Sequence, residues 1–503
     1  MPILLRNATV VAMDAAHGSQ PFRADVLVDG TTIDAVGPDL AVPDGTHVID
    51  CTERLVMPGM VNAHLHSVET PFKGRYDGMP LEIWMLYCYP ILGLFDLPER
   101  MVYLRTMVVA LESLRNGVTC VLDDIANQGI SGMAQVFAAY DDSGMRASVS
   151  DNMRNRYFTE TLPFVRDMLP QELLNEEAKS PPPTTEDYLE LCREAIKRFH
   201  DPTGRLRYVI APSAPQRCTT ELLTASMELA EQHDTSYHIH VLETKVQAVT
   251  GQEHYQRTLV RYLHDIDALH RRTTLAHGIW LTPGDIELLA DVGASVAHNP
   301  ISNQKLGAGI APFRQLRDAG VNIGLGTDGI CSNDSARMFD VMKAGSLLHH
   351  VTSPDHTTWP TASELLHAAT VGGARSANLE GTTGSITPGL EADLVVLDLR
   401  TVAFTPRNDL RNHLVYCENG ASIDYVLVAG KIVVDHGQVT TVDEDALLEE
   451  FRSYMPEFLR QWELVEQLNR RFEPYVQAMH DTCSQRPLGF SRYSGDSRTW
   501  ERS

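Results

Sequence analysis

An apolar run ends in two histidines in the stretch Met57-Pro58-Gly59-Met60-Val61-Asn62-Ala63-His64-Leu65-His66. Later segments repeat this arrangement, in which an apolar run leads into residues that can bind a metal or move a proton: His238-Ile239-His240 with Glu243, His277, His298-Asn299 and Thr327-Asp328. Side chains at the ends of successive strands meet at one point only when the strands form a barrel. Because barrels of alternating strands and helices collect their functional groups at the carboxyl ends of the strands, we predict an α/β fold with a (β/α)8 TIM barrel.

Both ends of the chain have the pattern of short strands joined by tight turns. Residues 1–56 alternate apolar runs with Gly and Asp turns, and a similar pattern returns after residue 380. We therefore expect residues 1–56 and 381–440 to form one small β-sandwich domain, with the barrel of residues 57–380 inserted between them. Apolar residues at helical spacing follow, so residues 441–503 are predicted to form a helical extension with a polar tail.

The composition is that of an acidic globular protein. The chain has 503 residues, enough for a barrel with a satellite domain, and 43% of them are hydrophobic. Its 66 acidic and 42 basic residues give a net charge of −24, which disfavours nucleic acid or an anionic membrane as a partner. The eight cysteines show no Cys-x-x-Cys pairs, no apolar run is long enough to span a membrane, and the first residues lack a signal-peptide pattern. We therefore expect a cytoplasmic protein with reduced thiols.

The histidines that end the apolar runs have the spacing of metal ligands. His64 and His66 lie two apart on a predicted strand, so both imidazoles project from one face, and His240 offers a third nitrogen. Zinc and ferrous iron accept neutral imidazole, and Asp328 offers an oxygen ligand. One His-x-His pair can arise by chance in a chain with 20 histidines, and Asp328 by itself could instead cap a helix. The ordered set, rather than any one member, indicates a site for one divalent metal ion.

Glu243, His277 and Asp328 are the candidate catalytic residues. Glu243 follows His240 by three residues, in the loop after a predicted strand, from which it could move a proton between water and substrate. His277 could orient the water or polarise the attacked carbon. As alternatives, Glu243 could be a carboxylate at a helix N-terminus, and a single histidine is usually a core residue.

Other residues near the ends of predicted strands are candidates for the substrate pocket. Trp84 could stack on a flat ring, although an aromatic residue at this spacing is more often part of the core. His298 is also compatible with a structural role. The candidates for substrate binding are Trp84, Asp124, Asn127, His298 and Asn303.

Several motifs resemble those of the amidohydrolase superfamily, in the branch that holds metal-dependent aminohydrolases of purines and related bases and the triazine hydrolases. The motifs are PGMVNAHLH (58–66), HIHVLET (238–244), LAHG (275–278), AHNPISNQKLGAGIAP (297–312), GLGTDG with SNDS (324–335) and GSITPGLEADLVVLD (384–398). The resemblance implies a distorted (β/α)8 barrel, a flanking β domain and one divalent metal ion, Zn or Fe(II). Carried over motif by motif, it implies His64, His66, His240 and Asp328 as ligands and Glu243 and His277 as catalytic partners.

The resemblance also implies hydrolytic removal of a group, usually an amine, from an electron-poor carbon of a heteroaromatic ring. Bound metal lowers the pKa of water, and Glu243 and Asp328 would take up the proton. The branch members that deaminate adenosine-type thioethers have Arg, Glu and His where this chain has Asp151, Leu92 and Ser213. We therefore expect deamination of a free purine, pterin, pyrimidine or triazine rather than of a nucleoside.

Several alternatives to deamination of a free base are kept, and the less favoured deamination of an adenosine-type nucleoside is one of them. The reaction could be removal of chloride or an alkylamine from such a ring, or opening of a cyclic amide, because the leaving group is selected by the shape of the pocket. A non-catalytic barrel would be expected to lack ligands, whereas the complete set is present. The expected partner is a small heterocyclic substrate, and the resemblance implies a homo-oligomer.

Overall fold

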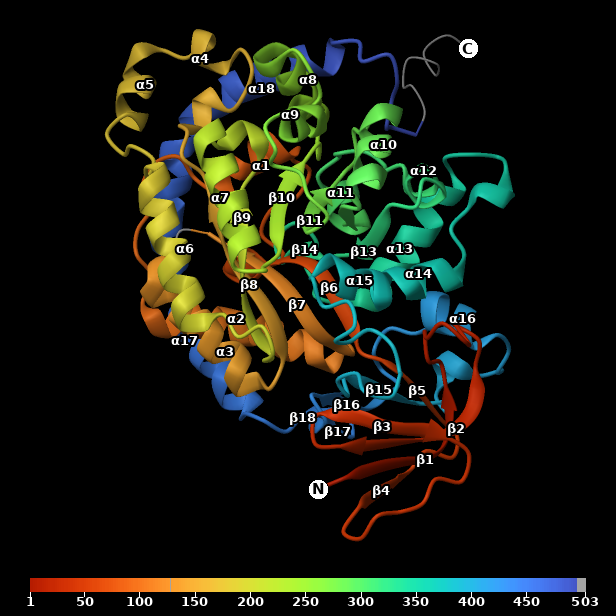
Figure 1. Cartoon of the computed structure of the whole chain (residues 1–503). Coiled ribbons are helices and arrows are strands. Elements are labelled where there is room, and N and C mark those ends of the chain that lie inside the picture. The colour runs from red at the N-terminus through yellow and green to blue at the C-terminus, as the bar shows by residue number, and fades with distance from the viewer. Residues whose placement is uncertain (127, 495–503) are drawn as a thin grey trace.

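The computed structural model describes residues 1–126 and 128–494, and its central element is a closed barrel of parallel strands (Figure 1). The strands follow one another around the barrel in chain order, and β14 closes it by pairing with β6. They are β6 (Met60–His66), β7 (Val118–Ile125), β8 (Arg146–Met153), β9 (Leu206–Pro212), β10 (Tyr237–Val241), β11 (Thr273–His277), β12 (Ser295–His298), β13 (Asn322–Leu325) and β14 (Asp328–Gly329). This arrangement confirms the predicted distorted TIM barrel, in which β13 and β14 are two parts of the last strand.

The first and last strands are joined by a pair of side-chain contacts at the break between β13 and β14. Asn62 in β6 donates from Nδ2 to Oγ1 of Thr327 at 2.7 Å and accepts from the Thr327 backbone N–H at 3.0 Å. Gly326 precedes this contact, and a Cβ there would lie 2.3 Å from Oδ1 of Asn299. Only glycine fits this close approach, so the GLGTDG motif closes the barrel as well as supplying Asp328.

Helices connect the barrel strands and cover the outside of the barrel (Figure 1). Thr184, Thr282 and Thr361 each begin a helix with a reciprocal capping box, which satisfies backbone N–H groups that the first turn leaves free. The helices up to residue 412 are α1 (Leu81–Cys88), α2 (Glu99–Arg115), α3 (Gly129–Ser143), α4 (Val165–Met168), α5 (Gln171–Glu177), α6 (Thr185–Phe199), α7 (Thr220–Gln232), α8 (Lys245–Tyr255), α9 (Leu259–Asp265), α10 (Pro283–Val292), α11 (Pro300–Lys305), α12 (Phe313–Asp318), α13 (Met338–His350), α14 (Ala362–Ala369), α15 (Val371–Ser376) and α16 (Leu410–Asn412).

The two chain ends together form a second sheet of nine strands, as the sequence predicts. Its strands are β1 (Ile3–Val10), β2 (Phe22–Asp29), β3 (Thr32–Gly37), β4 (His47–Asp50), β5 (Arg54–Pro58), β15 (Leu394–Asp398), β16 (Ile423–Val428), β17 (Lys431–Asp435) and β18 (Gln438–Val439). The antiparallel pair of β5 and β15 joins the two ends of the chain. The sheet folds back on itself as a sandwich. The β16–β17 turn at Gly430 lies against the β2–β3 turn at Gly30, and apolar side chains from the N-terminal and C-terminal strands form one core.

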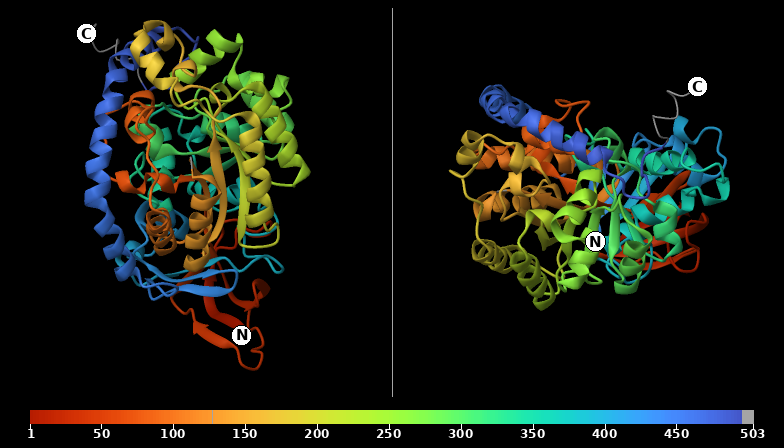
Figure 2. Two further views of the ribbon diagram at one scale, coloured as in Figure 1. Left: turned by 90° about the vertical axis from the view of Figure 1, so that its left-hand side faces the viewer. Right: turned by 90° about the horizontal axis from the view of Figure 1, so that it is seen from above.

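The C-terminal extension runs along the side of the barrel (Figure 2). It consists of α17 (Glu444–Asn469) and α18 (Glu473–Gln485), which confirms the predicted helical extension. Beyond α18 the chain returns to the barrel, where the backbone N–H of Ile310 donates to the carbonyl oxygen of Arg492 at 2.8 Å. None of the helices within residues 1–126 and 128–494 is both long and apolar enough to cross a membrane.

Candidate metal centre

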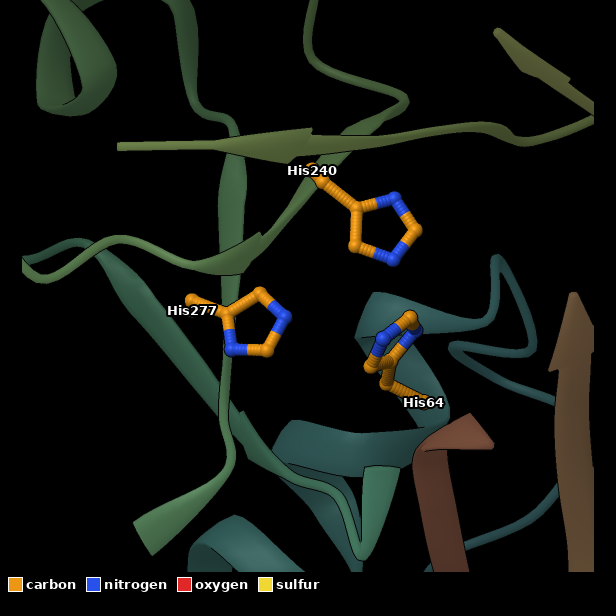
Figure 3. Close-up of side chains that lie close together, drawn as sticks. All are labelled: His64, His240 and His277. Atoms are coloured by element: carbon orange, nitrogen blue, oxygen red, sulfur yellow. The ribbon is translucent and has the colours of Figure 1, made fainter. Parts of the chain in front are cut away.

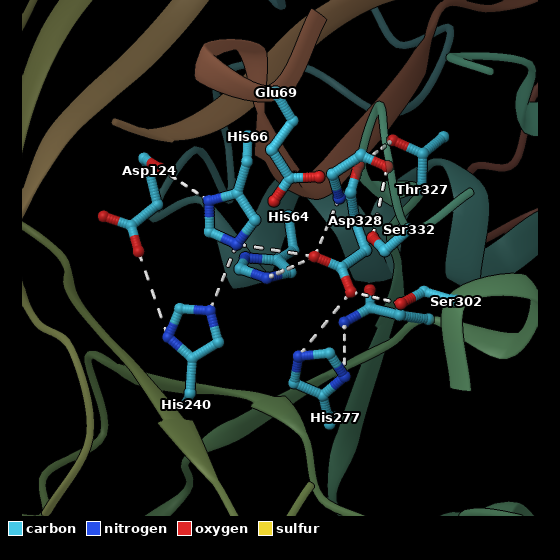
Figure 4. Close-up of polar contacts among 12 residues, drawn as sticks. His64, His66, Glu69, Asp124, His240, His277, Ser302, Thr327, Asp328 and Ser332 are labelled. Carbon is cyan, nitrogen blue, oxygen red and sulfur yellow. Dashed lines mark hydrogen bonds and ion pairs between the residues drawn. The ribbon is translucent and has the colours of Figure 1, made fainter. Parts of the chain in front are cut away.

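Side chains from the ends of β6, β10, β11 and β14 converge at the carboxyl end of the barrel (Figure 3 and Figure 4). Nε2 of His64 and Nε2 of His66 lie 3.3 Å and 3.4 Å from Oδ1 of Asp328. His64, His240 and His277 form a second set whose nitrogens lie within 4.8 Å of one another. All of these side chains are buried, so the structure brings together the residues that the sequence singled out.

Two of the converging residues have a left-handed backbone. His277 has φ of 74° and Asp328 has φ of 65°, a region that residues other than glycine seldom adopt. Such a conformation costs about 1–3 kcal/mol and persists where the surrounding structure imposes it, often at functional sites. Next to Asp328, a Cβ on Gly329 would collide with the carboxylate of Glu69, so this turn also requires glycine. The strand ends are thus held in a conformation that turns side chains toward one another.

The hydrogen bonds of His66 and His240 leave space for a cation between their rings. Nδ1 of His66 donates to the carbonyl oxygen of Asp124 at 2.6 Å, and Nδ1 of His240 donates to that of Ser213 at 2.8 Å. The two Nε2 atoms then face each other at 3.2 Å, and two neutral rings would present only acceptors there. Nε2 of His64 is buried and lies 3.3 Å from Oδ1 of Asp328, but it makes no hydrogen bond of regular geometry among the described residues. A proton or a metal ion is needed to satisfy these nitrogens.

The charges around the histidines favour a cation as well. Burial alone would lower the pKa of His66, but the carboxylates of Asp328, Glu69 and Asp124 raise it to about 9. Burial alone would raise the pKa of Asp328, but the neighbouring histidines, His277 first among them, hold it well below its ordinary range. A set of imidazole nitrogens with one carboxylate oxygen is the donor set of zinc and iron sites, so the residues present fit a divalent metal ion.

Glu243 and His277 lie beside this ligand set. Oε2 of Glu243 is 3.6 Å from Nε2 of His277, which is in turn 3.9 Å from Oδ2 of Asp328. Burial, assisted by the charge of Asp328, raises the pKa of Glu243 well above its ordinary value, so this carboxyl group favours its protonated form. Nδ1 of His277 donates to Oδ1 of Asn303 at 2.9 Å, which directs Nε2 toward the metal centre. Glu243 therefore has the placement and the pKa of a proton donor.

Three residues that the sequence suggested for substrate binding lie behind the metal centre instead. The Asp124 carboxylate accepts from Oγ of Ser150 at 2.7 Å, because β7 continues to Ile125 and directs this side chain toward β8. Asn303 fixes the ring of His277, and His298 packs against Phe313 and His349. Asp124 and Asn303 therefore hold other site residues in position. Asn127, the fourth such candidate, lies outside the described residues.

A cavity of about 40 Å³ opens onto the metal centre. Trp84 lines it, as predicted, together with His66, His240, Glu243, His277 and Asp328. The other polar residues of its wall were not predicted from the sequence; they are Glu69, Tyr89, Asn152, Arg154, Arg217 and Ser332. Glu69 follows His66 by three residues, which is a signal that could have identified it, whereas Arg217 and Tyr89 follow no recognisable strand-end pattern.

Glu69 is held firmly at the edge of this cavity. Its carboxylate accepts from the hydroxyl group of Tyr89 at 2.7 Å and from the backbone N–H of Cys331 at 3.0 Å. Burial, together with the charge of Asp328, raises the pKa of Glu69 to about 7 in spite of His66 nearby. Glu69 thus adds a third carboxyl group, besides Asp328 and Glu243, to the wall that a substrate would contact.

Imidazole and carboxylate ligands with an adjacent proton donor at the carboxyl end of a barrel define a metal-dependent hydrolase. The model of the amidohydrolase family matches residues 55–433, and the chain belongs to this family. It is 33% identical over 450 residues to a 5'-deoxyadenosine deaminase from Methanosarcina mazei, which covers 89% of this chain and 96% of the relative. The predicted superfamily and the prediction of an aminohydrolase acting on C–N bonds are thereby confirmed.

Solved structures share the architecture. An adenosine deaminase from Xanthomonas campestris with bound zinc has a TM-score of 0.80 and 27% identity, over 91% of this chain and 98% of that chain. Atrazine chlorohydrolase from Arthrobacter aurescens in complex with zinc has a TM-score of 0.80 and 24% identity, over 90% of this chain and 100% of that chain. Both similar structures contain zinc, one of the two ions that the donor set of the candidate metal centre fits.

Proposed function

We propose that the protein is a metal-dependent deaminase that converts the amino group of an adenosine-type nucleoside to a carbonyl group and releases ammonia. The observation that carries this proposal is the position of Glu243, a buried carboxyl group 3.6 Å from Nε2 of His277 at the edge of the candidate ligand set, where burial raises its pKa. The class of substrate is supported by the relative that deaminates 5'-deoxyadenosine and by the structural likeness to an adenosine deaminase. The sequence-based preference for a free base receives no support from these relatives.

The three departures that favoured a free base have structural counterparts elsewhere in the cavity wall. Leu92 lines none of the cavities next to the metal centre, and Ser213 is engaged through its carbonyl oxygen with His240. Arg217 and Arg154 instead present guanidinium groups to the cavity, where they can donate to acceptors on a purine or a sugar. This chain can therefore recognise a nucleoside through residues other than those that its relatives use.

The residues of this site divide the chemistry between them. His64, His66, His240 and Asp328 would hold the ion, which when bound lowers the pKa of water toward neutrality and so supplies a nucleophile. Glu243 donates its proton to the ring nitrogen next to the attacked carbon. Of the two protons of the water, one passes through Asp328 to the leaving amine, and the other, released when the C=O bond forms, restores the proton of Glu243, so that water and the C–NH₂ group yield C=O and NH₃.

Ammonia release by the purified, metal-loaded protein tests this function. The panel holds 5'-deoxyadenosine, adenosine, adenine, cytosine and an aminotriazine, and mass spectrometry identifies the product in which oxygen replaces the amine. We expect ammonia from the nucleosides and little from the free bases. Turnover of adenine or the triazine alone would restore the free-base prediction, and the loss of a group other than ammonia would refute deamination.

A further inference from the structure

The cavity at the metal centre is too small for a whole nucleoside. It measures about 40 Å³, whereas pockets for small-molecule ligands usually have volumes of about 300–1,000 Å³. A second cavity of about 540 Å³ adjoins it, and Glu69, Tyr89 and Arg154 line both. A substrate whose amine reacts at the metal centre must therefore extend into an adjoining cavity. A third cavity, of about 200 Å³, also adjoins the metal centre and shares Arg217 with it, but the cavity of about 540 Å³, which we call the aromatic compartment, is the larger of the two.

The aromatic compartment is walled in part by the C-terminal extension. Phe458 and Trp462 of α17 line it beside Phe72 and Phe95, which come from the segments before and after α1. The ring centroids of Phe72 and Trp462 lie 4.7 Å apart, and those of Phe95 and Phe458 lie 6.1 Å apart. Aromatic rings of this kind bind apolar or flat groups through their large apolar surfaces. Residues nearly 400 positions apart in the chain thus form one wall.

The wall contributed by α17 is fixed in place by hydrogen bonds to the barrel side. Nε1 of Trp462 donates to the carbonyl oxygen of Tyr87 at 3.0 Å, and the hydroxyl group of Tyr76 donates to Oε1 of Glu466 at 2.6 Å. Asn469, near the end of α17, accepts from the backbone N–H of Ile91 at 2.8 Å. These contacts hold Phe458 and Trp462 at defined positions, as selection between similar ligands requires.

A buried guanidinium group also lines the aromatic compartment. Arg105 of α2 is only 3% exposed, and its Nε and Nη2 have no hydrogen-bond partner among the described residues. Burial lowers the pKa of Arg105 to about 10, so the group is still charged at neutral pH. Two buried guanidinium nitrogens that donate to no acceptor are costly even with the charge of Asp123 nearby, and an oxygen atom of a bound ligand would satisfy them. Arg105 therefore offers a donor to an oxygen of whatever occupies the compartment.

We propose that the aromatic compartment is the subsite for the sugar and 5'-substituent of the nucleoside, and that Phe458 and Trp462 of the C-terminal extension select for an apolar 5'-substituent. This proposal rests on the proposed nucleoside deamination. The sugar supplies oxygen acceptors for Arg105, and the substituent packs against the aromatic wall. The extension is thus part of the active site and determines specificity through KM rather than through the chemical step.

A pair of phenylalanines on α17 provides a matched test. Phe458 lines the compartment, whereas Phe451, two turns earlier on the same helix, packs against the apolar cores and does not line it. The experiment compares Phe458→Ala with Phe451→Ala on 5'-methylthioadenosine and adenosine, which differ at the 5' position. We expect the wild type to favour the methylthio substrate, and Phe458→Ala to reduce the ratio of the two kcat/KM values about tenfold, mainly through KM. In Phe451→Ala the ratio stays within about twofold of the wild type.

Several outcomes would overturn the proposal. Equal ratios in the two variants, with the wild type active, would refute the role of the extension and leave the deaminase function intact. A wild type that releases no ammonia from any nucleoside would refute the function and this proposal with it. If Phe458→Ala does not fold, as judged by circular dichroism, Phe458→Leu is measured in its place, and an unchanged ratio in that variant also counts against the proposal.

Discussion

Replacing Glu243 by Gln is the sharpest perturbation of the proposed chemistry. Glutamine keeps the size of the side chain but cannot give up a proton, and the contact of Oε2 with Nε2 of His277 is long, at 3.6 Å. The substitution therefore removes the proton donor with little change in packing. General acid–base catalysis contributes about 10²–10⁴-fold, so kcat should fall by that factor, which corresponds to roughly 3–5 kcal/mol in the activation free energy.

The assay measures kcat for 5'-deoxyadenosine together with the metal content of each protein. Glu82→Gln is the matched control, because Glu82 is also a buried glutamate close to Glu243, but it bonds to Oγ1 of Thr244 and does not line the cavity. We expect the control to retain kcat within about tenfold of the wild type. A Glu243→Gln variant that carries its full metal and keeps a kcat within the same limit would refute the proton-donor role.

Four further predictions address the metal and the stability of the protein. Ser302 donates to Oδ2 of Asp328, so Ser302→Ala should lower metal affinity or activity about 10–100-fold. Metal titration and kcat measure the effect, and unchanged values would show that Ser302 does not position Asp328. Chelation should lower the melting temperature of the protein, and re-addition of zinc should restore it; a chelator without effect would argue against a bound ion. Arg105→Met should raise the melting temperature while reducing kcat/KM for nucleosides, because it removes a buried charge whose Nε and Nη2 have no hydrogen-bond partner among the described residues. A lower melting temperature would mean that Arg105, with the charge of Asp123 nearby, stabilises the fold. Burial lowers the pKa of His349 from 6.5 to about 4. Between these two pH values the unfolded chain binds a proton at this residue and the folded chain does not. Stability that is present above pH 6.5 is therefore lost as the pH falls toward 4. The loss in the free energy of unfolding amounts to roughly 3 kcal/mol. In His349→Leu, the free energy of unfolding measured with urea should depend less on pH across this range, and a pH dependence equal to that of the wild type would contradict the prediction.

The sequence predicted best those features that are local in the chain. Each strand-end motif holds its ligand and the apolar run before it within about ten residues, so His64, His66, His240 and Asp328 could be identified before the fold was known. The helical extension was predicted for the same reason, from the periodicity of its apolar residues. The barrel and the β-sandwich followed from the order of these segments.

The residues of the pocket wall were predicted less well. Whether a side chain faces the cavity depends on where its strand ends, and β7 runs to Ile125, so Asp124 bonds to β8 instead of facing the substrate. The preference for a free base rested on Asp151, Leu92 and Ser213, which were compared one position at a time. Such a comparison does not consider cavity-lining residues from other segments, such as Arg217.

The sequence by itself determined the fold class, the candidate metal ligands and the class of reaction, because these depend on short runs that carry their own structural signal. Only the tertiary structure decided that Asn303 orients His277 and that Phe458 lines the aromatic compartment. It also decided that Nε and Nη2 of Arg105 are buried without a hydrogen-bond partner among the described residues. These roles arise from contacts between segments that are distant in the chain. Such contacts are set by the packing of helices against the barrel, which no local pattern of residues encodes.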